Sequence, residues 1–577
     1  MDQQKRINRK GSRSILGRAS RPKKRPTPPN RHSFGETSSS AKKLKHSDEE
    51  VPISATHGYR IISFVAIFSS LSEMLKCKTC NGNINFSESN ICGLGFKLVV
   101  NCDNCEPRYI NSCPLIKNAY EINRRIVFVM RLLGIGYDGV KKFCGLMDIS
   151  KMFTKNVYYD ILENIHIASK AVTSILFSEA ACEEKLLTAQ AENTSELAGL
   201  YVSGDGTWRK RGFSSLQGVV SLIGIHSGKV LDIIVKSLYC KGCEYGKKIE
   251  NTQEFETWEE SHKDTCSITH EGNAGKMEVD GAVEMFARSE ELHGVKYTSY
   301  IGDGDCKTYK GIVESRPYGD DVLINKKECV GHVQKRMGAR LRKVKKDTKG
   351  LGGKGKLTAK LIDELSVYYG LAIRRHKDSK EEMKTAIWAT LKHKCSTDNN
   401  PQHDNCPPGP NSWCTWQVAK ANNKLTEYVH KPALHQDVIK AITPIYEELS
   451  RDDLLERCVG GYTQNNNESL NGLIWSFAPK KLFSGLKTVE IATNIAASIF
   501  NKGYASIILM MNIMHITIGP ITNSICETLD ERRISIAEAR MLQMSKESRT
   551  ARRQERMSIQ DSLCEKKNLY YEAGMAD

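Results

Sequence analysis

The sequence of 577 residues lacks an apolar run long enough to cross a membrane. Its most apolar stretch, Ala505–Ile518, covers about 14 residues and contains Asn512 and His515, whereas a spanning helix needs roughly 20 apolar residues. The sequence also has no apolar run behind a basic start, which is the pattern of a secretory signal. We therefore expect neither a membrane partner nor a secreted protein.

The sequence has too few acidic residues to balance its basic ones. Lys and Arg number 84 against 67 Asp and Glu, which gives a formal charge of +17. Such an excess favours a polyanionic partner, with nucleic acid ahead of an anionic membrane surface. The 19 cysteines are an odd number and fall largely into Cys-x-x-Cys or Cys/His groups. Without a secretory signal, this pattern indicates metal sites in a reducing compartment, not a disulfide scaffold.

Residues 1–50 are predicted to be a disordered basic tail, because Lys, Arg, Ser and Pro dominate and no apolar period exists. Two short basic clusters, Arg21–Pro26 and Ala41–His46, suit either a nuclear import signal or an arm that binds phosphates. A merely solvated tail is the alternative. We expect the protein to act in the nucleus.

Residues 51–118 carry the strongest spacing signal in the chain. Two Cys-x-x-Cys turns flank a predicted strand, Phe96–Asn101, and such paired turns are typical of a zinc ribbon. The predicted zinc ligands are Cys77, Cys80, Cys102 and Cys105. Free structural cysteines are the alternative.

Residues 119–190 are predicted to be helical, with helices over 122–133, 137–146 and 154–171. Short helices joined by turns are the arrangement of a helix-turn-helix DNA reader. An ordinary packing unit of three helices fits the pattern equally well.

Residues 197–346 form a predicted α/β domain. Three antiparallel strands, over 200–203, 215–225 and 229–239, are followed by helix, strand, helix, strand and a basic helix. The fourth and fifth strands are expected over 295–301 and 321–325. This order is the topology of ribonuclease H, in which the first and fourth strands lie side by side and parallel.

Acidic residues stand at the tips of those two strands. Asp205 follows the first and Asp303 follows the fourth, with Asp305 as an alternative second acid. Neighbouring carboxylates repel unless a cation neutralises them, and Mg²⁺ binds through few carboxylates and several waters. We therefore predict a site for Mg²⁺ or Mn²⁺ between the two strands.

A helical insertion is predicted over residues 347–455, and the α/β domain is expected to resume over 456–525. Glu468 lies in the first turn of the first helix after the insertion and offers a third carboxylate, although the helix dipole favours a Glu there in any case. Residues 526–577 are predicted to be a charged helix and a tail.

Two further Cys/His groups have spacings suited to zinc. The first, in a hydrophilic insertion, comprises Cys240, Cys243, His262 and Cys266. The second, in a Pro-rich loop, comprises His393, Cys395, His403, Cys406 and Cys414. Loose surface cysteines and histidines are the alternative for both. Basic side chains near the acids are predicted to bind DNA phosphates: Arg209, Lys210, Arg211, Lys335, Arg336, Arg340, Arg342 and Lys343.

The motifs GDGTW, IGDGD, ECVGH and NNNESLNGLIW, taken in this order, resemble the transposase domain of Mutator-like DNA transposons of the animal type. The resemblance covers roughly residues 60–480. It includes GKMEVDGAVEMFARS and a Cys-x-x-His element, Cys329 and His332, that runs into a basic helix. The zinc-knuckle motif that some relatives carry after the third acid is missing, so recognition of DNA ends must lie elsewhere.

The resemblance implies that Asp205, Asp303 and Glu468 are the catalytic acids of a DDE-type enzyme, with His332 beside them in a supporting position. It implies metal-dependent cleavage and strand transfer at terminal inverted repeats, on double-stranded DNA and without a small-molecule substrate. We expect a homodimer or higher oligomer, because two transposon ends are handled together. The alternatives are a domesticated, catalytically silent zinc-dependent DNA-binding regulator and a ribonuclease-H-like nuclease.

Overall fold

The computed structural model describes residues 38–44, 51–149, 153–194, 197–210, 215–304, 306–353, 355–410 and 412–544. The chain divides into two compact units, which are treated separately: Met1–Lys42 with Arg532–Asp577, and Lys43–Glu531. The described part of the first unit is helical, from α1 (Ser39–Lys43) and the end of α20 (Pro520–Met544). None of the described helices could span a membrane.

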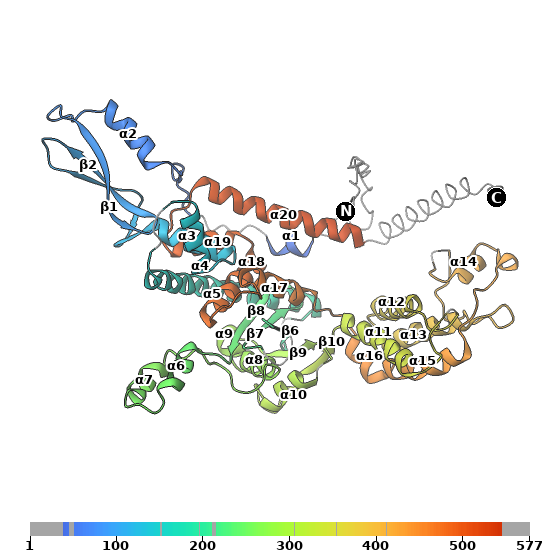
Figure 1. The fold of residues 1–577 in the computed structure, drawn as a ribbon. Coiled ribbons are helices and arrows are strands. Elements are labelled where there is room, and N and C mark those ends of the chain that lie inside the picture. Colours follow the sequence, from blue (N-terminus) through green and yellow to red (C-terminus); the bar gives the residue numbers. More distant parts are fainter. Residues whose placement is uncertain are drawn as a thin grey trace, which may run out of the picture. The chain divides into compact units, whose positions relative to one another are not determined.

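The centre of the second unit is a five-stranded mixed sheet (Figure 1). Its strands are β6 (Leu200–Trp208), β7 (Gln217–Gly224), β8 (Val230–Ser237), β9 (Tyr297–Gly302) and β10 (Asn325–Glu328). The spatial order is β10-β9-β6-β7-β8. Strands β6, β9 and β10 run parallel, while β7 is antiparallel to both of its neighbours. The first and fourth strands are therefore adjacent and parallel, as the order of elements predicted.

Helices cover both faces of this sheet, because its buried strands alternate their side chains between two cores. Val219 and Ile233 belong to a core shared with α5 (Lys155–Glu192) and α18 (Leu486–Lys502). Val220 and Leu222 belong to a second core on the opposite face, shared with α8 (Lys276–Ala287). Burial of such side chains stabilises the fold by about 1.5–3 kcal/mol each.

Helix α5 is much longer than the helix predicted over 154–171. It starts after the N-cap Thr154, runs for 38 residues and ends at Asn193, which adopts φ 53°. Its buried face continues through Leu176 and Ala180, so no breaker ends it earlier. It packs on the sheet and on α18. The third helix of the predicted DNA reader is therefore a core helix of the α/β fold, preceded by α3 (Glu121–Leu132) and α4 (Tyr137–Leu146).

The fifth strand was predicted too early, at 321–325. The hydrogen-bonded strand β10 is Asn325–Glu328, a charged segment without an apolar alternation. The buried carboxylate of Glu328 in this strand is neutralised by two ion pairs. It lies 2.6 Å from Arg336 and 3.5 Å from Arg457. Ion pairing therefore takes the place of the apolar pattern that the prediction required.

The segment before α3 folds into a separate antiparallel sheet of β1 (Ile84–Cys92), β2 (Gly95–Cys102) and β3 (Arg108–Asn111). Helix α2 (Phe64–Met74) lies on this sheet through an aromatic cluster of Phe64, Phe68, Phe86 and Phe96. No residue of α2 is buried. A short hairpin, β4 (Leu115–Ile116) and β5 (Ala119–Tyr120), leads into α3.

The helices between β10 and the end of the α/β fold build a core of their own. They are α11 (Val330–Asp347), α12 (Ala359–Arg375), α13 (Lys380–Cys395), α15 (Gln436–Leu449) and α16 (Asp452–Cys458), while α14 (Thr415–Ala421) contributes no residue to it. Met337, Tyr369 and Ile442 are fully buried in this core. The chain then returns to the sheet through α17 (Asn465–Phe477), α18 and α19 (Ala505–Ile513).

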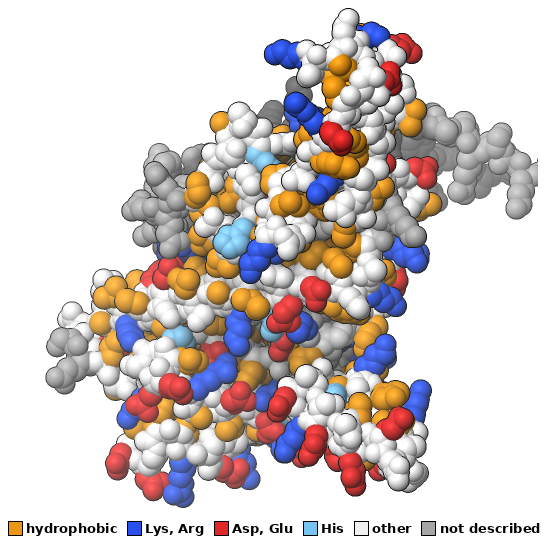
Figure 2. Space-filling view, turned by 90° about the vertical axis from the view of Figure 1, so that its left-hand side faces the viewer, with side chains coloured by type: hydrophobic (Ala, Val, Ile, Leu, Met, Phe, Trp, Pro, Cys, Tyr) orange, Lys and Arg blue, Asp and Glu red, His pale blue; other side chains and the backbone are white. Residues whose placement is uncertain are grey.

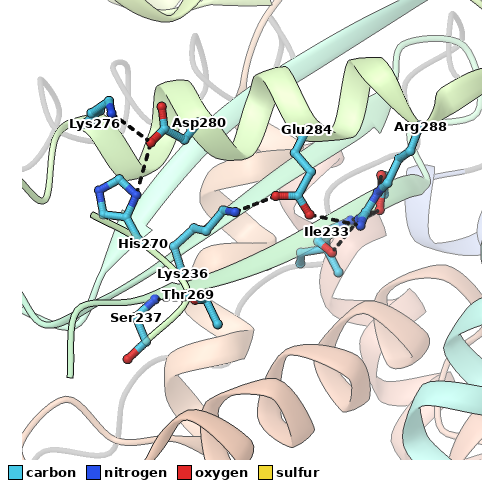
Figure 3. A network of polar contacts seen from close by, with 10 residues as sticks. Ile233, Lys236, Ser237, Thr269, His270, Lys276, Asp280, Glu284 and Arg288 are labelled. Atoms are coloured by element: carbon cyan, nitrogen blue, oxygen red, sulfur yellow. Dashed lines mark hydrogen bonds and ion pairs between the residues drawn. The ribbon is translucent and has the colours of Figure 1, made fainter. Parts of the chain in front are cut away.

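A chain of charged contacts fastens α8 to β8 (Figure 3). Arg288, which caps α8, donates to buried Asp232 at 2.6 and 2.8 Å, and Lys236 lies 2.5 Å from Glu284. Burial raises the pKa of Asp232, although the hydrogen bonds from Arg288 oppose this rise. Arg288 therefore offsets a desolvation cost that its loss would expose.

We expect Arg288→Ala to destabilise the second unit by about 3–5 kcal/mol, because the Asp232 carboxylate would stay buried without a partner. Arg316→Ala is the matched control: its ion pair with Asp320 is exposed and should contribute less than about 1 kcal/mol. Urea unfolding followed by fluorescence measures both. Equal effects of the two substitutions would contradict this account. So would a double variant, Arg288→Ala with Asp232→Asn, that is no more stable than Arg288→Ala alone.

Candidate functional site

Amide side chains fix α17 against β6. Gln464, at the N-cap of α17, donates through Nε2 to the carbonyl of Gly204 at 2.7 Å. One turn later, Asn467 is fully buried and donates to the carbonyl of Ser203 at 3.1 Å, while its own oxygen accepts from the Ser203 hydroxyl at 2.8 Å. These bonds use the backbone of the strand segment that directly precedes Asp205.

The same stripe of α17 continues along the strand. Asn471 donates through Nδ2 to Asp205 Oδ2 at 2.7 Å, and Trp475 donates through Nε1 to the Thr207 hydroxyl at 2.9 Å. The four contacting residues recur every three or four positions, which places them on one face of the helix. The sequence prediction missed their role, although three of them, Asn467, Asn471 and Trp475, lie in the NNNESLNGLIW motif and Gln464 directly precedes it.

Asp205 lies in the middle of β6 and is largely shielded from solvent. Burial raises its pKa to about 6; the Asn471 hydrogen bond opposes the rise, and the charges of Asp303 and Glu468 add to it. The three predicted acids are therefore close enough to interact electrostatically. Three such carboxyl groups resist simultaneous ionisation unless a cation neutralises them.

Strand register accounts for the proximity of Asp303. Ser203 on β6 is the parallel partner of Ile301 on β9. Two residues further along the chain are Asp205, which is still in β6, and Asp303, the first residue after β9, so the two acids lie at neighbouring positions of the β6–β9 pair. The alternative acid, Asp305, lies outside the described residues.

The third predicted acid, Glu468, is carried by α17. It lies in the first turn of the helix, four residues after Gln464 and three before Asn471, so it is next to both on the helix surface. Its Oε1 lies 3.4 Å from Nζ of Lys335 on α11. Both side chains are exposed, so this ion pair is weak and easily exchanged for another cation.

His332, near the start of α11, links that helix to the acids. Its Nδ1 lies 2.9 Å from Oε1 of Gln464. A hydrogen bond with buried Cys329 raises the pKa of His332, burial opposes this, and the charge of Asp303 raises it further. The Cys-x-x-His element therefore contacts the amide stripe of α17, beside the carboxylates.

Many of the basic side chains predicted to bind DNA contact protein groups. The guanidinium of Arg336 is held by buried Glu328, so its charge is neutralised within the fold. On the face drawn in Figure 2, cationic and anionic side chains are interspersed. Lys210 and Lys343 are exposed, and Arg211 lies outside the described residues. Ion pairs join Lys335 to Glu468, Arg340 to Glu448 and Arg342 to Asp363.

The first Cys/His group has the geometry of a tetrahedral zinc site. The sulfurs of Cys77, Cys80, Cys102 and Cys105 lie within 4.8 Å of one another. Two of these distances are 3.3 Å, between Cys80 and Cys102, and 3.8 Å, between Cys77 and Cys105. A tetrahedral ion with Zn–S bonds of about 2.3 Å requires about 3.8 Å. The group sits at one end of the β1–β2 hairpin, as the spacing predicted.

The second group joins the end of β8 to two short helices, α6 (Lys241–Ile249) and α7 (Glu254–Lys263). Cys240, Cys243, His262 and Cys266 form a set within 4.8 Å. The ring of Trp258 stacks on His262 at 4.7 Å and orients it. The predicted ligand set is thus brought together despite the hydrophilic sequence around it.

The third group differs from the prediction by one residue. His393, His403, Cys406 and Cys414 form a set within 4.8 Å, and Cys395 is not part of it. Cys395 instead packs against the core of the insertion. It follows His393 by two positions on α13, so the two side chains point to nearly opposite sides of the helix.

An imidazole pair supports this third group and was missed by the sequence prediction. His403 Nε2 lies 2.9 Å from Nε2 of His430, whose Nδ1 lies 2.7 Å from Asp398. Nδ1 of His403 faces Cys414 Sγ at 3.4 Å. Nδ1 is therefore the metal-facing nitrogen, and the chain to Asp398 fixes the tautomer of His403. No spacing rule pointed to His430, which lies 27 residues from its partner.

We expect the purified chain to retain three zinc ions, one for each group. Removing a pair of ligands, as in Cys102→Ser with Cys105→Ser, should remove one ion because two remaining thiolates cannot close a tetrahedral site. Elemental analysis of the native and variant chains measures the content. Fewer than one zinc ion per chain in the native protein would refute the assignment.

His430→Ala should weaken zinc retention at the third group about 10- to 100-fold, because His403 would lose the partner that orients it. Competition with a chelator measures the effect. His435→Asn is the control: His435 is half-exposed and caps α15, and Asn is an equally good N-cap. Identical retention in both variants would exclude the supporting role.

The family model described as Mutator-like transposase matches residues 58–414, which is more than half of the 577 residues. The matched range includes Asp205, Asp303 and all three Cys/His groups, and it ends before Glu468. No curated protein and no solved structure matches the chain. The chain therefore belongs to the Mutator-like transposase family.

Proposed function

We propose that this protein is a DDE-type transposase that cleaves DNA at terminal inverted repeats and joins the ends to target DNA. Asp205, Asp303 and Glu468 are the proposed catalytic carboxylates. The observation that carries the proposal is geometric: the β6–β9 register brings Asp303 beside Asp205, and Asn471 of α17 bonds Asp205 three residues after Glu468. Carboxylates gathered at one place suit a divalent cation, which offsets their mutual repulsion.

The proposed catalytic core has the ribonuclease-H-like fold, interrupted by the helical insertion. The strand order β10-β9-β6-β7-β8, with two parallel and two antiparallel strand pairs, supports this. In such a core, Asp205 within β6 and Asp303 directly after the adjacent parallel strand β9 are carried by neighbouring strands. The proposed domain boundaries are those derived from the sequence, with the core in two parts, 197–346 and 456–525.

Two Mg²⁺ or Mn²⁺ ions bound by these carboxylates would lower the pKa of the attacking water or DNA 3′-hydroxyl and stabilise the leaving oxygen. The residues of the chain orient the site. Asn471 holds one oxygen of Asp205 and leaves the other for a ligand. His332 and Gln464 brace the strand segment beside it. Such prearranged groups give catalysis by positioning and charge neutralisation.

Membership of a transposase family supports double-stranded DNA as the partner. Among the predicted phosphate contacts, exposed Lys210 and Lys343 are the strongest candidates, whereas Arg336 is committed to Glu328. We further propose a homodimer or higher oligomer that acts in the nucleus. The oligomer follows from the need to bring two DNA ends together, and the nuclear location from the DNA partner and the basic clusters Arg21–Pro26 and Ala41–His46.

Asp205→Asn should lower Mg²⁺- or Mn²⁺-dependent cleavage and strand transfer at least about 100-fold, because a neutral amide neither repels its neighbours nor binds a hard cation well. Asn471 can still pair with the new side chain, so folding and DNA binding should persist. The measurement uses DNA that carries the element's terminal inverted repeats. Asp303→Asn and Glu468→Gln should behave alike.

Asp320→Asn is the matched control, since Asp320 is an exposed partner of Arg316 in the loop between α10 and β10 and is not among the proposed acids; it should leave the rates unchanged. Cleavage that survives Asp205→Asn would reject the residue assignment. A wild-type chain that binds these repeats but cleaves them with neither cation would reject the enzyme and favour a DNA-binding regulator.

A further inference from the structure

The loop of residues 479–485, which follows α17, is fastened to the sheet beyond the acids. Arg209, just after β6, donates to the carbonyl of Leu482 at 2.5 Å. Gln217, at the start of β7, donates to the carbonyl of buried Ser484 at 2.9 Å. Between these two anchors stands Phe483, with 64% of its surface exposed. The exposed ring is therefore carried by a backbone that is fixed on both sides.

The ring itself is also held in place. Tyr239 meets it edge to face, with centroids 5.6 Å apart and planes at 83°. The guanidinium of Arg209 lies 5.2 Å from its centroid. Exposure of an aromatic ring to water costs free energy. Tyr239 and Arg209 nevertheless hold this ring in its exposed position. We call Phe483, Arg209 and Tyr239 the aromatic platform.

The surroundings of the platform are basic. Lys210, next to Arg209 in the sequence, and Lys481, two residues before Phe483, are both exposed. Lys480 lies 5.0 Å from the ring of Trp475. Neither Trp208–Phe213 nor Ala478–Gly485 contains an acidic residue. A rigid aromatic face among cations suits a nucleobase with its phosphates, whereas an apolar peptide would gain nothing from the charge.

The platform lies in line with the acids. Side chains at alternate positions of a strand share a face, so Asp205, Thr207 and Arg209 point the same way. Their partners follow in the same order, with Asn471 and Trp475 on α17 and Leu482 in the loop. Four residues of strand place Arg209 about 13 Å from Asp205, which is about four nucleotide steps of a DNA strand.

We propose that the aromatic platform binds an unpaired base of the DNA strand whose backbone is positioned at Asp205, by stacking on Phe483. The inference rests on the proposed function for the placement of that strand. The second Cys/His group supports the platform, because Tyr239 directly precedes Cys240. The substrate class is thus DNA that is frayed or single-stranded a few nucleotides from the reacting phosphate.

The test uses the full-length, zinc-loaded chain without added Mg²⁺ or Mn²⁺. Two probes are compared: a terminal-repeat duplex with a single-stranded extension that carries 2-aminopurine, and the same repeat fully paired. Phe483→Ala should weaken binding of the extended DNA about 5- to 150-fold, the range for loss of one stacked base. It should also abolish quenching of 2-aminopurine, while Phe483→Tyr should restore both.

Leu482→Ala is the matched control, since Leu482 is 54% exposed in the same loop but has no aromatic face; it should bind both DNAs normally. Equal binding and quenching by wild type and Phe483→Ala would overturn the platform, and so would equal loss on extended and fully paired DNA. These readouts need no cleavage. Stacking by a chain that fails to cleave would uphold the platform and reject only the catalytic assignment.

Discussion

The site depends on the buried amide contacts between α17 and β6. Asn471 and Asp205 are 266 positions apart in sequence and 2.7 Å apart in space. The hydrogen bonds of Gln464 and Asn467 to the backbone of β6 fix the position of α17 along the strand. A buried amide left without its partners would cost about 1–3 kcal/mol. A helix that slid by one turn would lose all four contacts together, so the position of Glu468 is strongly specified.

The sequence predicted the elements that carry regular patterns. The order of strands, the parallel pairing of the first and fourth, and three cysteine-rich ligand groups follow from periodicity and spacing, and the structure contains them. The prediction failed where tertiary contacts replaced a local pattern. Strand β10 is stabilised by an ion pair between Glu328 and Arg336. Helix α5 extends beyond its predicted end because its buried face continues. His430 contributes through space alone, and no local signal marks it.

The Cys/His groups lie in segments that have few apolar side chains to bury. Helix α2 has no buried residue, and the sheet beneath it relies on a few aromatic contacts. The segment with α6 and α7 is mostly polar and holds together around Cys243 and His262. In modules this small, binding of an ion substitutes for a hydrophobic core and couples folding to metal supply. The insertion has both features: a buried helical core and, in its loop, a Cys/His group that could hold an ion.

The separation of the acids along the chain has a consequence for protein synthesis. A ribosome-bound chain that has just completed β9 carries Asp205 and Asp303, but α17 has yet to be made. Because domains fold as units, the sheet that carries these two residues is completed only when α17 and α18, which pack on it, have been made. Chains that end within the insertion therefore contain the first two Cys/His groups and two of the three proposed acids, but lack α17 and α18. Under the proposed assignment, the third carboxylate is the last part of the site to be synthesised.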